Sequence, residues 1–115
     1  MEGFRGPQVC RLTGLSYRQI DYWDRIGLAC PSITPASGSG SGSLRLYSTG
    51  NVVLMKAIHD LLAAGFSLQF IRGEFASGLR DAIDAGRSEY RWQTGPVTHA
   101  IDLASLRRQF TPIAA

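Results

Sequence analysis

The chain has 115 residues, of which 44% are hydrophobic, a size and composition suited to one domain with a modest core. Its net charge of +3 permits nucleic-acid binding without proving it. The two cysteines, Cys10 and Cys30, form no CxxC pair, which argues against a disulfide scaffold and against a structural zinc site. We see no secretory leader and no apolar run approaching the ~20 residues that span a bilayer, so we expect a cytoplasmic protein.

The first predicted element is a short helix over Gly6–Leu12. Pro7 suits the first helical position, where its missing N–H costs nothing. Thr13 and Gly14 then break the pattern and predict a tight turn.

A second helix is predicted to begin after Ser16. Ser16 and Gln19 have the spacing of a capping box, in which each residue bonds to the backbone N–H of the other. Ile20 and Trp23 fall on one side and are expected in the core, and Gly27 ends the helix. Two short helices joined by a tight turn are typical of a helix-turn-helix.

A wing is predicted between the second and third helices. Two short apolar pieces, Leu28–Ile33 and Leu44–Tyr47, flank the pure Ser/Gly run Ser37–Ser43. Such a run does not hold a fixed conformation by itself, so it suits the tip of a long hairpin. The alternative is a linker between two domains, but each flanking piece is too small to fold alone.

Two further helices follow the wing. Ser48 caps a third helix over about Thr49–Ala64, with a buried apolar stripe. Ser67 caps a fourth helix, expected to run on to Phe75 although Gly73 weakens it.

The C-terminal third gives weaker signals. Glu89–Gln93 and Val97–Ile101 flank a Thr-Gly-Pro turn and can pair as a hairpin. Asp102 can cap a last helix that includes Leu106 and Phe110.

Three segments together resemble the MerR family. Gln8–Leu28 is similar to the opening helix-turn-helix of that family, Arg45–Ser48 to the end of its wing, and Leu61–Arg72 to the junction of its third and fourth helices. The resemblance implies a mainly α fold, a winged helix-turn-helix of four helices with a β-hairpin wing, over residues 1–75. Residues 76–115 would form a short hairpin and helix appendage for dimerisation or partner docking.

The resemblance also implies a DNA-binding surface. A recognition helix presents polar side chains from its N-terminal half to base edges in the major groove, while the wing grips the flanking backbone. The residues expected to contact DNA are Ser16, Tyr17, Arg18, Gln19, Tyr22, Arg25, Arg45 and Tyr47. Asp21 departs from the family, in which many relatives carry arginine; it is expected to pair with Arg18 or Arg25 or to accept from a cytosine.

The function predicted is sequence-specific binding of double-stranded DNA by a transcriptional regulator without a large effector domain. A bacterial or phage protein of the nucleoid is expected, as a possible homodimer, with RNA polymerase or another protein as a further partner. Two alternatives stay open: an excisionase-like accessory protein that bends DNA, and a protein-interaction module on the same scaffold. We expect no enzyme activity, because no nucleophile–base pair or phosphate-cradling loop is visible, and no metal or other cofactor.

Overall fold

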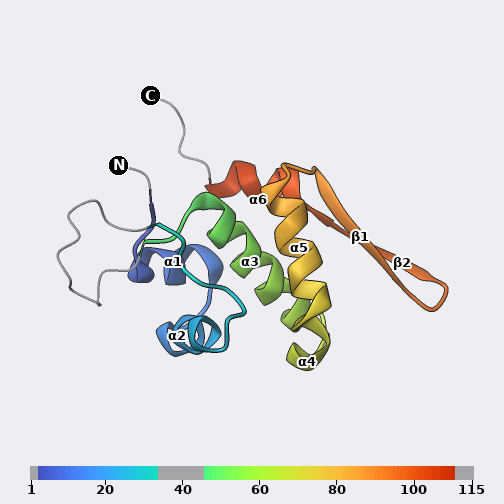
Figure 1. Cartoon of the computed structure of the whole chain (residues 1–115), viewed down its shortest axis with the longest axis horizontal. Coiled ribbons are helices and arrows are strands. Elements are labelled where there is room, and N and C mark those ends of the chain that lie inside the picture. The colour runs from blue at the N-terminus through green and yellow to red at the C-terminus, as the bar shows by residue number, and fades with distance from the viewer. Residues whose placement is uncertain (1–2, 34–45, 111–115) are drawn as a thin grey trace.

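The computed structural model describes residues 3–33 and 46–110 (Figure 1). The described elements, in chain order, are α1 (Gly6–Thr13), α2 (Tyr17–Arg25), α3 (Thr49–Ala63), α4 (Leu68–Ile71), α5 (Glu74–Asp84), β1 (Glu89–Thr94), β2 (Val97–Asp102) and α6 (Leu103–Phe110). The predicted fold class, mainly α with a winged helix-turn-helix, is confirmed.

The helix-turn-helix forms as its local signals predict. α1 carries proline near its start and ends at Gly14, whose φ of 84° lies in the left-handed region that suits glycine. α2 begins after Ser16 with both halves of the capping box in place. Ile20 and Trp23 are the buried residues of α2, each no more than 2% exposed, and they anchor the helix to the core.

The base of the wing is a small set of backbone pairs. The N–H groups of Phe4 and Tyr47 each donate to the carbonyl of the other at 2.8 Å, and the N–H of Ile33 donates to the Leu46 carbonyl at 3.2 Å. The chain therefore leaves this base at Ile33 and returns at Leu46 beside it. The predicted Ser/Gly tip lies outside the described residues.

Asn51 joins the wing base to the start of α3. Its Oδ1 atom accepts from the Ser48 N–H at 2.8 Å, as in a capping box, and also from the N–H and hydroxyl of Ser32 at 3.0 and 2.8 Å. One amide thus caps α3 and holds the last residues before the wing.

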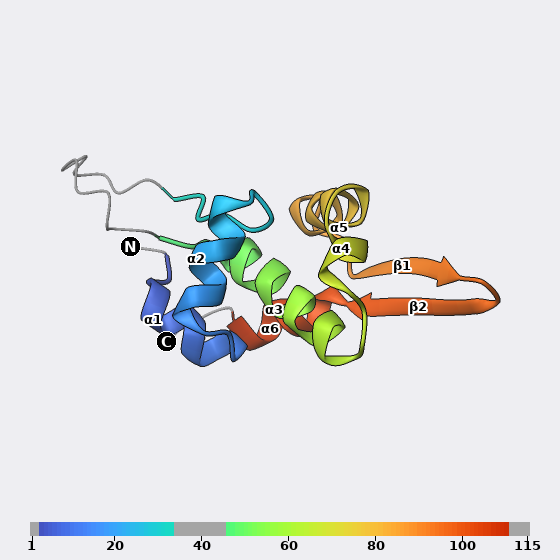
Figure 2. The same ribbon diagram turned by 90° about the horizontal axis from the view of Figure 1, so that it is seen from below.

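The predicted fourth helix is wrong in its extent. α4 stops at Ile71, and Gly73 takes a φ of 81° before α5 begins at Glu74. Gly73 does more than weaken a helix: its left-handed backbone separates two helices that run in different directions (Figure 2).

The predicted hairpin and last helix both form. β1 and β2 pair antiparallel across a two-residue turn, with Trp92 opposite His99. Asp102 caps α6 by accepting from the Ser105 N–H at 2.9 Å. Figure 2 shows the hairpin extending away from the helices.

One apolar core runs through the described residues. It includes Val9 and Trp23 from the first two helices, Ile58 from α3, Leu79 from α5 and Leu103 from α6. α3 lies at its centre and packs against α1, α5 and α6.

Candidate nucleic-acid interface

The outer side of α2 is a polar, solvent-exposed surface. The Tyr17 side chain is 57% exposed and the Tyr22 side chain is 43% exposed. Arg18 and Gln19 are exposed as well. We call Tyr17, Arg18, Gln19 and Tyr22 the α2 face. Buried Ile20 and Trp23 fix the helix from below, so the α2 face is held on a rigid support.

The capping box restricts what Gln19 can offer. Its Oε1 atom accepts from the Ser16 N–H at 2.9 Å, and the Ser16 hydroxyl accepts from the Gln19 N–H at 3.1 Å. A glutamine that reads adenine needs both its carbonyl and its amide group. With the box formed, Gln19 presents only its NH₂ donors, which suit a phosphate or another base acceptor.

Gly6 determines where the Tyr17 ring lies. A Cβ atom added at Gly6 would stand 2.9 Å from Cε1 of Tyr17, so the ring rests against the start of α1. Sequence reasoning missed this role. The only signal was a glycine directly before Pro7, where a small residue has no other obvious purpose.

Asp21 pairs with Arg25, one of the two partners expected for it. Their carboxylate and guanidinium lie 3.2 Å apart at an i,i+4 spacing, and the Arg25 side chain remains 67% exposed. The ion pair offsets the negative charge of Asp21 on this helix. It engages one nitrogen of the Arg25 guanidinium, whose other N–H groups can still donate to a phosphate.

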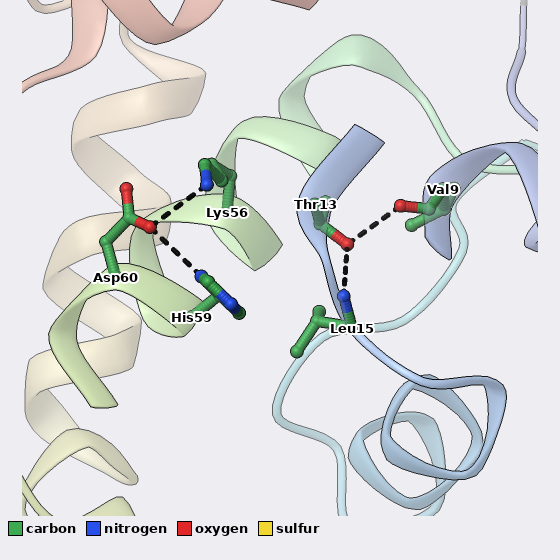
Figure 3. Close-up of polar contacts among 6 residues, drawn as sticks. All are labelled: Val9, Thr13, Leu15, Lys56, His59 and Asp60. Carbon is green, nitrogen blue, oxygen red and sulfur yellow. Dashed lines mark hydrogen bonds and ion pairs between the residues drawn. The ribbon is translucent and has the colours of Figure 1, made fainter. Parts of the chain in front are cut away.

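A buried threonine holds the turn between α1 and α2 (Figure 3). The Thr13 hydroxyl donates to the Val9 carbonyl at 2.7 Å and accepts from the Leu15 N–H at 3.2 Å. His59 of α3 supports the same turn, because a Cβ atom at Gly14 would lie 3.3 Å from its Nε2. The angle between the two helices is therefore set by contacts on both sides of the turn.

An arginine far along the chain anchors the exit of α2. The Arg80 guanidinium on α5 donates to the Leu28 carbonyl at 2.7 Å. Sequence reasoning did not connect these residues, since 52 positions separate them.

Two of the predicted DNA contacts have other outcomes. Tyr47 is 0% exposed and belongs to the core, so its expected contact with DNA is wrong. The reason is its place in the wing base, where its backbone pairs with Phe4 and its side chain turns inward. Arg45 lies outside the described residues.

The surroundings of both cysteines raise the pKa of the thiol. Burial is the largest cause that raises the pKa of the Cys10 thiol, and it also raises that of Cys30. The Cys30 thiol donates to the Asp24 backbone carbonyl at 3.6 Å, and the Asp24 side chain nearby raises the pKa of the thiol further. Within the described ranges, no three His, Cys, Asp or Glu side chains gather in a way that could hold a metal ion.

An exposed, capped second helix, a tight turn before it and a paired wing base define a winged helix-turn-helix protein. The sequence model of the MerR HTH family regulatory proteins matches residues 4–77. The chain belongs to this family, as the resemblance predicted.

Relatives in mycobacteria carry the same segment. HTH-type transcriptional regulators of Mycobacterium bovis and of two Mycobacterium tuberculosis strains, each named as uncharacterised, are 49% identical over 70 residues. The match covers 61% of this chain and 30% of each relative, so the chain matches less than a third of their length. No helix in the described part of the chain has both the length and the apolar character to cross a membrane.

Proposed function

We propose that this chain binds double-stranded DNA in a sequence-specific way and regulates transcription, with the α2 face in the major groove. The observation that carries the proposal is the division of α2: polar and aromatic side chains lie outside, and Ile20 and Trp23 hold the helix from within. A rigid helix with a free polar side is what groove recognition requires.

Three residues of the α2 face have proposed roles in contacting DNA. Arg18 bonds a guanine edge or a phosphate, and the Tyr17 and Tyr22 hydroxyls bond phosphates that flank the groove. The start of α2 adds a partial positive charge that favours phosphate. Arg25 and Arg45 supply further backbone contacts, and two copies would bind a palindromic or repeated site.

The proposal is tested first by recovering genomic fragments that the protein retains, which yields a site. Affinity for that site and for random DNA is then measured by fluorescence anisotropy. Arg18→Ala is expected to weaken binding to the site by about 5- to 150-fold, the value of one lost base contact. Arg45→Ala should weaken binding to both DNAs alike, since a backbone contact carries no sequence information.

Arg108→Ala is the matched control, because it removes one exposed arginine from α6, away from the α2 face. Its affinity should stay within about twofold of the parent, as expected for a change in net charge alone at moderate salt. Equal binding by parent, Arg18→Ala and Arg45→Ala, with unchanged thermal midpoints, would disprove the proposal.

A further inference from the structure

A second candidate site lies on another side of α3. A cavity of about 410 Å³ opens between the C-terminal half of α3, the β hairpin and α6. Its volume falls in the range of about 300–1,000 Å³ found for small-molecule sites. Figure 1 shows α2 and the hairpin on different sides of α3, so this cavity is separate from the α2 face.

Aromatic rings form one wall of the cavity. Trp92 and His99, paired across the hairpin, stack with ring centres 5.0 Å apart. Phe66, before α4, meets both rings edge-on at 5.8 and 5.4 Å. All three residues line the cavity, which therefore offers a flat ring both faces and edges to pack against.

The charged groups of the lining are acidic. Asp60 and Asp102 both line the cavity, and among the described residues no lysine or arginine does. Figure 3 shows how Asp60 is held: its Oδ1 lies 3.1 Å from the Lys56 ammonium and 3.0 Å from the His59 ring. Carboxylates beside aromatic faces favour a cation, since both attract positive charge.

Trp92 adds an unsatisfied donor. Its indole N–H is buried and has no hydrogen-bond acceptor in the described part of the chain. Buried donors are nearly always paired, because an unpaired one costs about 1–3 kcal/mol. Trp92 also lines the cavity, so this unpaired donor belongs to the side chain that forms the aromatic wall.

We propose that this cavity binds a small planar aromatic molecule that carries a protonated amine. The ring would pack against Phe66, Trp92 and His99, and the amine would lie toward Asp60 and Asp102. The occupant is a free small molecule rather than a side chain of a partner protein. This inference does not depend on DNA binding, and its test uses no DNA.

The test follows the indole N–H signals of the full chain labelled with ¹⁵N. Trp92→Phe identifies the Trp92 signal, and Trp23, the buried tryptophan of α2, gives an internal reference. The probe is 5-hydroxytryptamine, whose ring is flat, whose amine is protonated and whose hydroxyl is an acceptor. N-acetyl-5-hydroxytryptamine and 5-hydroxyindole-3-acetate keep the ring but are neutral and anionic.

We expect 5-hydroxytryptamine to shift the Trp92 signal in a saturable way and to leave the Trp23 signal in place. The neutral and anionic analogues should bind at least about tenfold more weakly, because they lack the charge that the carboxylates attract. Asp102→Asn, in which asparagine still caps α6, should weaken binding of 5-hydroxytryptamine about fivefold. Asp84→Asn, the same change on the exposed side of α5, should leave it unchanged.

Three results would overturn the proposal. The first is that about 5 mM 5-hydroxytryptamine leaves the Trp92 signal unshifted. The second is that all three compounds shift this signal equally. The third is that Asp102→Asn and Asp84→Asn change the binding of 5-hydroxytryptamine equally. Asp60→Asn replaces Asp102→Asn if thermal unfolding shows that the latter does not fold. Loss of binding in either folded variant supports the site.

Discussion

Thr13 shows how one buried polar side chain positions the recognition helix. It is 1% exposed, and its hydroxyl donates to the Val9 carbonyl of α1 and accepts from the Leu15 N–H in the turn. The hydroxyl therefore replaces water for two backbone groups at the junction of α1 and α2. These two hydrogen bonds help to fix the orientation of α2 relative to α1.

Thr13→Val keeps the shape of the side chain and removes both hydrogen bonds. The Leu15 N–H is then left without its acceptor, at a cost of about 1–2 kcal/mol. The thermal midpoint, followed by circular dichroism, should fall by about 4–10 °C. Thr98→Val, on the exposed surface of β2, is the control and should leave the midpoint nearly unchanged; equal midpoints for both variants would contradict the assigned role.

Asp21 sets the charge of the proposed DNA surface. In the free protein it pairs with Arg25, and near phosphate its own charge is repelled. Asp21→Asn removes that repulsion and frees Arg25, so affinity for DNA should rise about threefold to tenfold. Fluorescence anisotropy at several salt concentrations measures the change.

Asp84→Asn alters the net charge equally but lies on α5, so it separates local charge from total charge. If both variants gain the same affinity, only the total charge matters. Weaker binding by Asp21→Asn would mean that the ion pair itself positions Arg25 for DNA.

At the scale of elements, helix ends decide the architecture. Ser16, Ser48 and Ser67 each accept from a backbone N–H three residues later, and these bonds fix where α2, α3 and α4 begin. The end of α5 is closed by local backbone bonds, among them those from the Ala85 N–H to the Asp81 carbonyl and from the Gly86 N–H to the Ile83 carbonyl, and a distant residue adds to them. The Arg107 guanidinium on α6 donates to the Ile83 carbonyl at 3.1 Å and to the Arg87 carbonyl at 2.7 Å.

Arg107→Met keeps the apolar stem and removes the side-chain donors that reach the Ile83 and Arg87 carbonyls at the end of α5. A positive charge there also complements the helix dipole, and the combined loss should be about 1 kcal/mol. The thermal midpoint should fall by about 4–8 °C. Arg108→Met, at the exposed neighbouring position, tests whether any arginine on α6 has this effect; if it is equally destabilising, the contact with α5 is not the cause.

At the scale of the whole molecule, the core joins the helix-turn-helix to the C-terminal segment. Leu79, Leu103, Leu106 and Phe110 are each at most 7% exposed and belong to the same cluster as Trp23. Arg80 reinforces the connection by bonding the exit of α2. The sequence predicted a domain over residues 1–75 and an appendage over residues 76–115. Because both parts share one core, a truncated chain is needed to test whether they are separate.

Residues 1–75 alone would expose the side of α3 that packs against α5 and α6. Each large apolar side chain removed from the core withdraws about 1.5–3 kcal/mol of burial. We expect no cooperative thermal unfolding from this fragment, measured by circular dichroism, whereas the full chain unfolds cooperatively. A fragment that melts cooperatively near the midpoint of the full chain would show that the C-terminal segment is a separate appendage.

The sequence by itself determined the elements whose signals are local. Capping serines, the Thr-Gly turn and the spacing of Ile20 and Trp23 act within a few residues, so α1, α2 and α3 could be predicted closely. The family resemblance rests on the same segments. The exposure of the α2 face also follows from helical periodicity, which places buried and exposed positions on opposite sides.

Only the tertiary structure decided which distant groups meet. Tyr47 was expected at DNA, but the pairing of the wing base with Phe4 turns it into the core. The sequence indicated only that Gly73 weakens a helix, and the structure shows that it ends one. The Arg80 bond to Leu28 and the cavity between α3 and the hairpin could not be predicted from the sequence. Burial and long-range contacts depend on how whole elements pack, and that packing is a property of the assembled core rather than of any short stretch of chain.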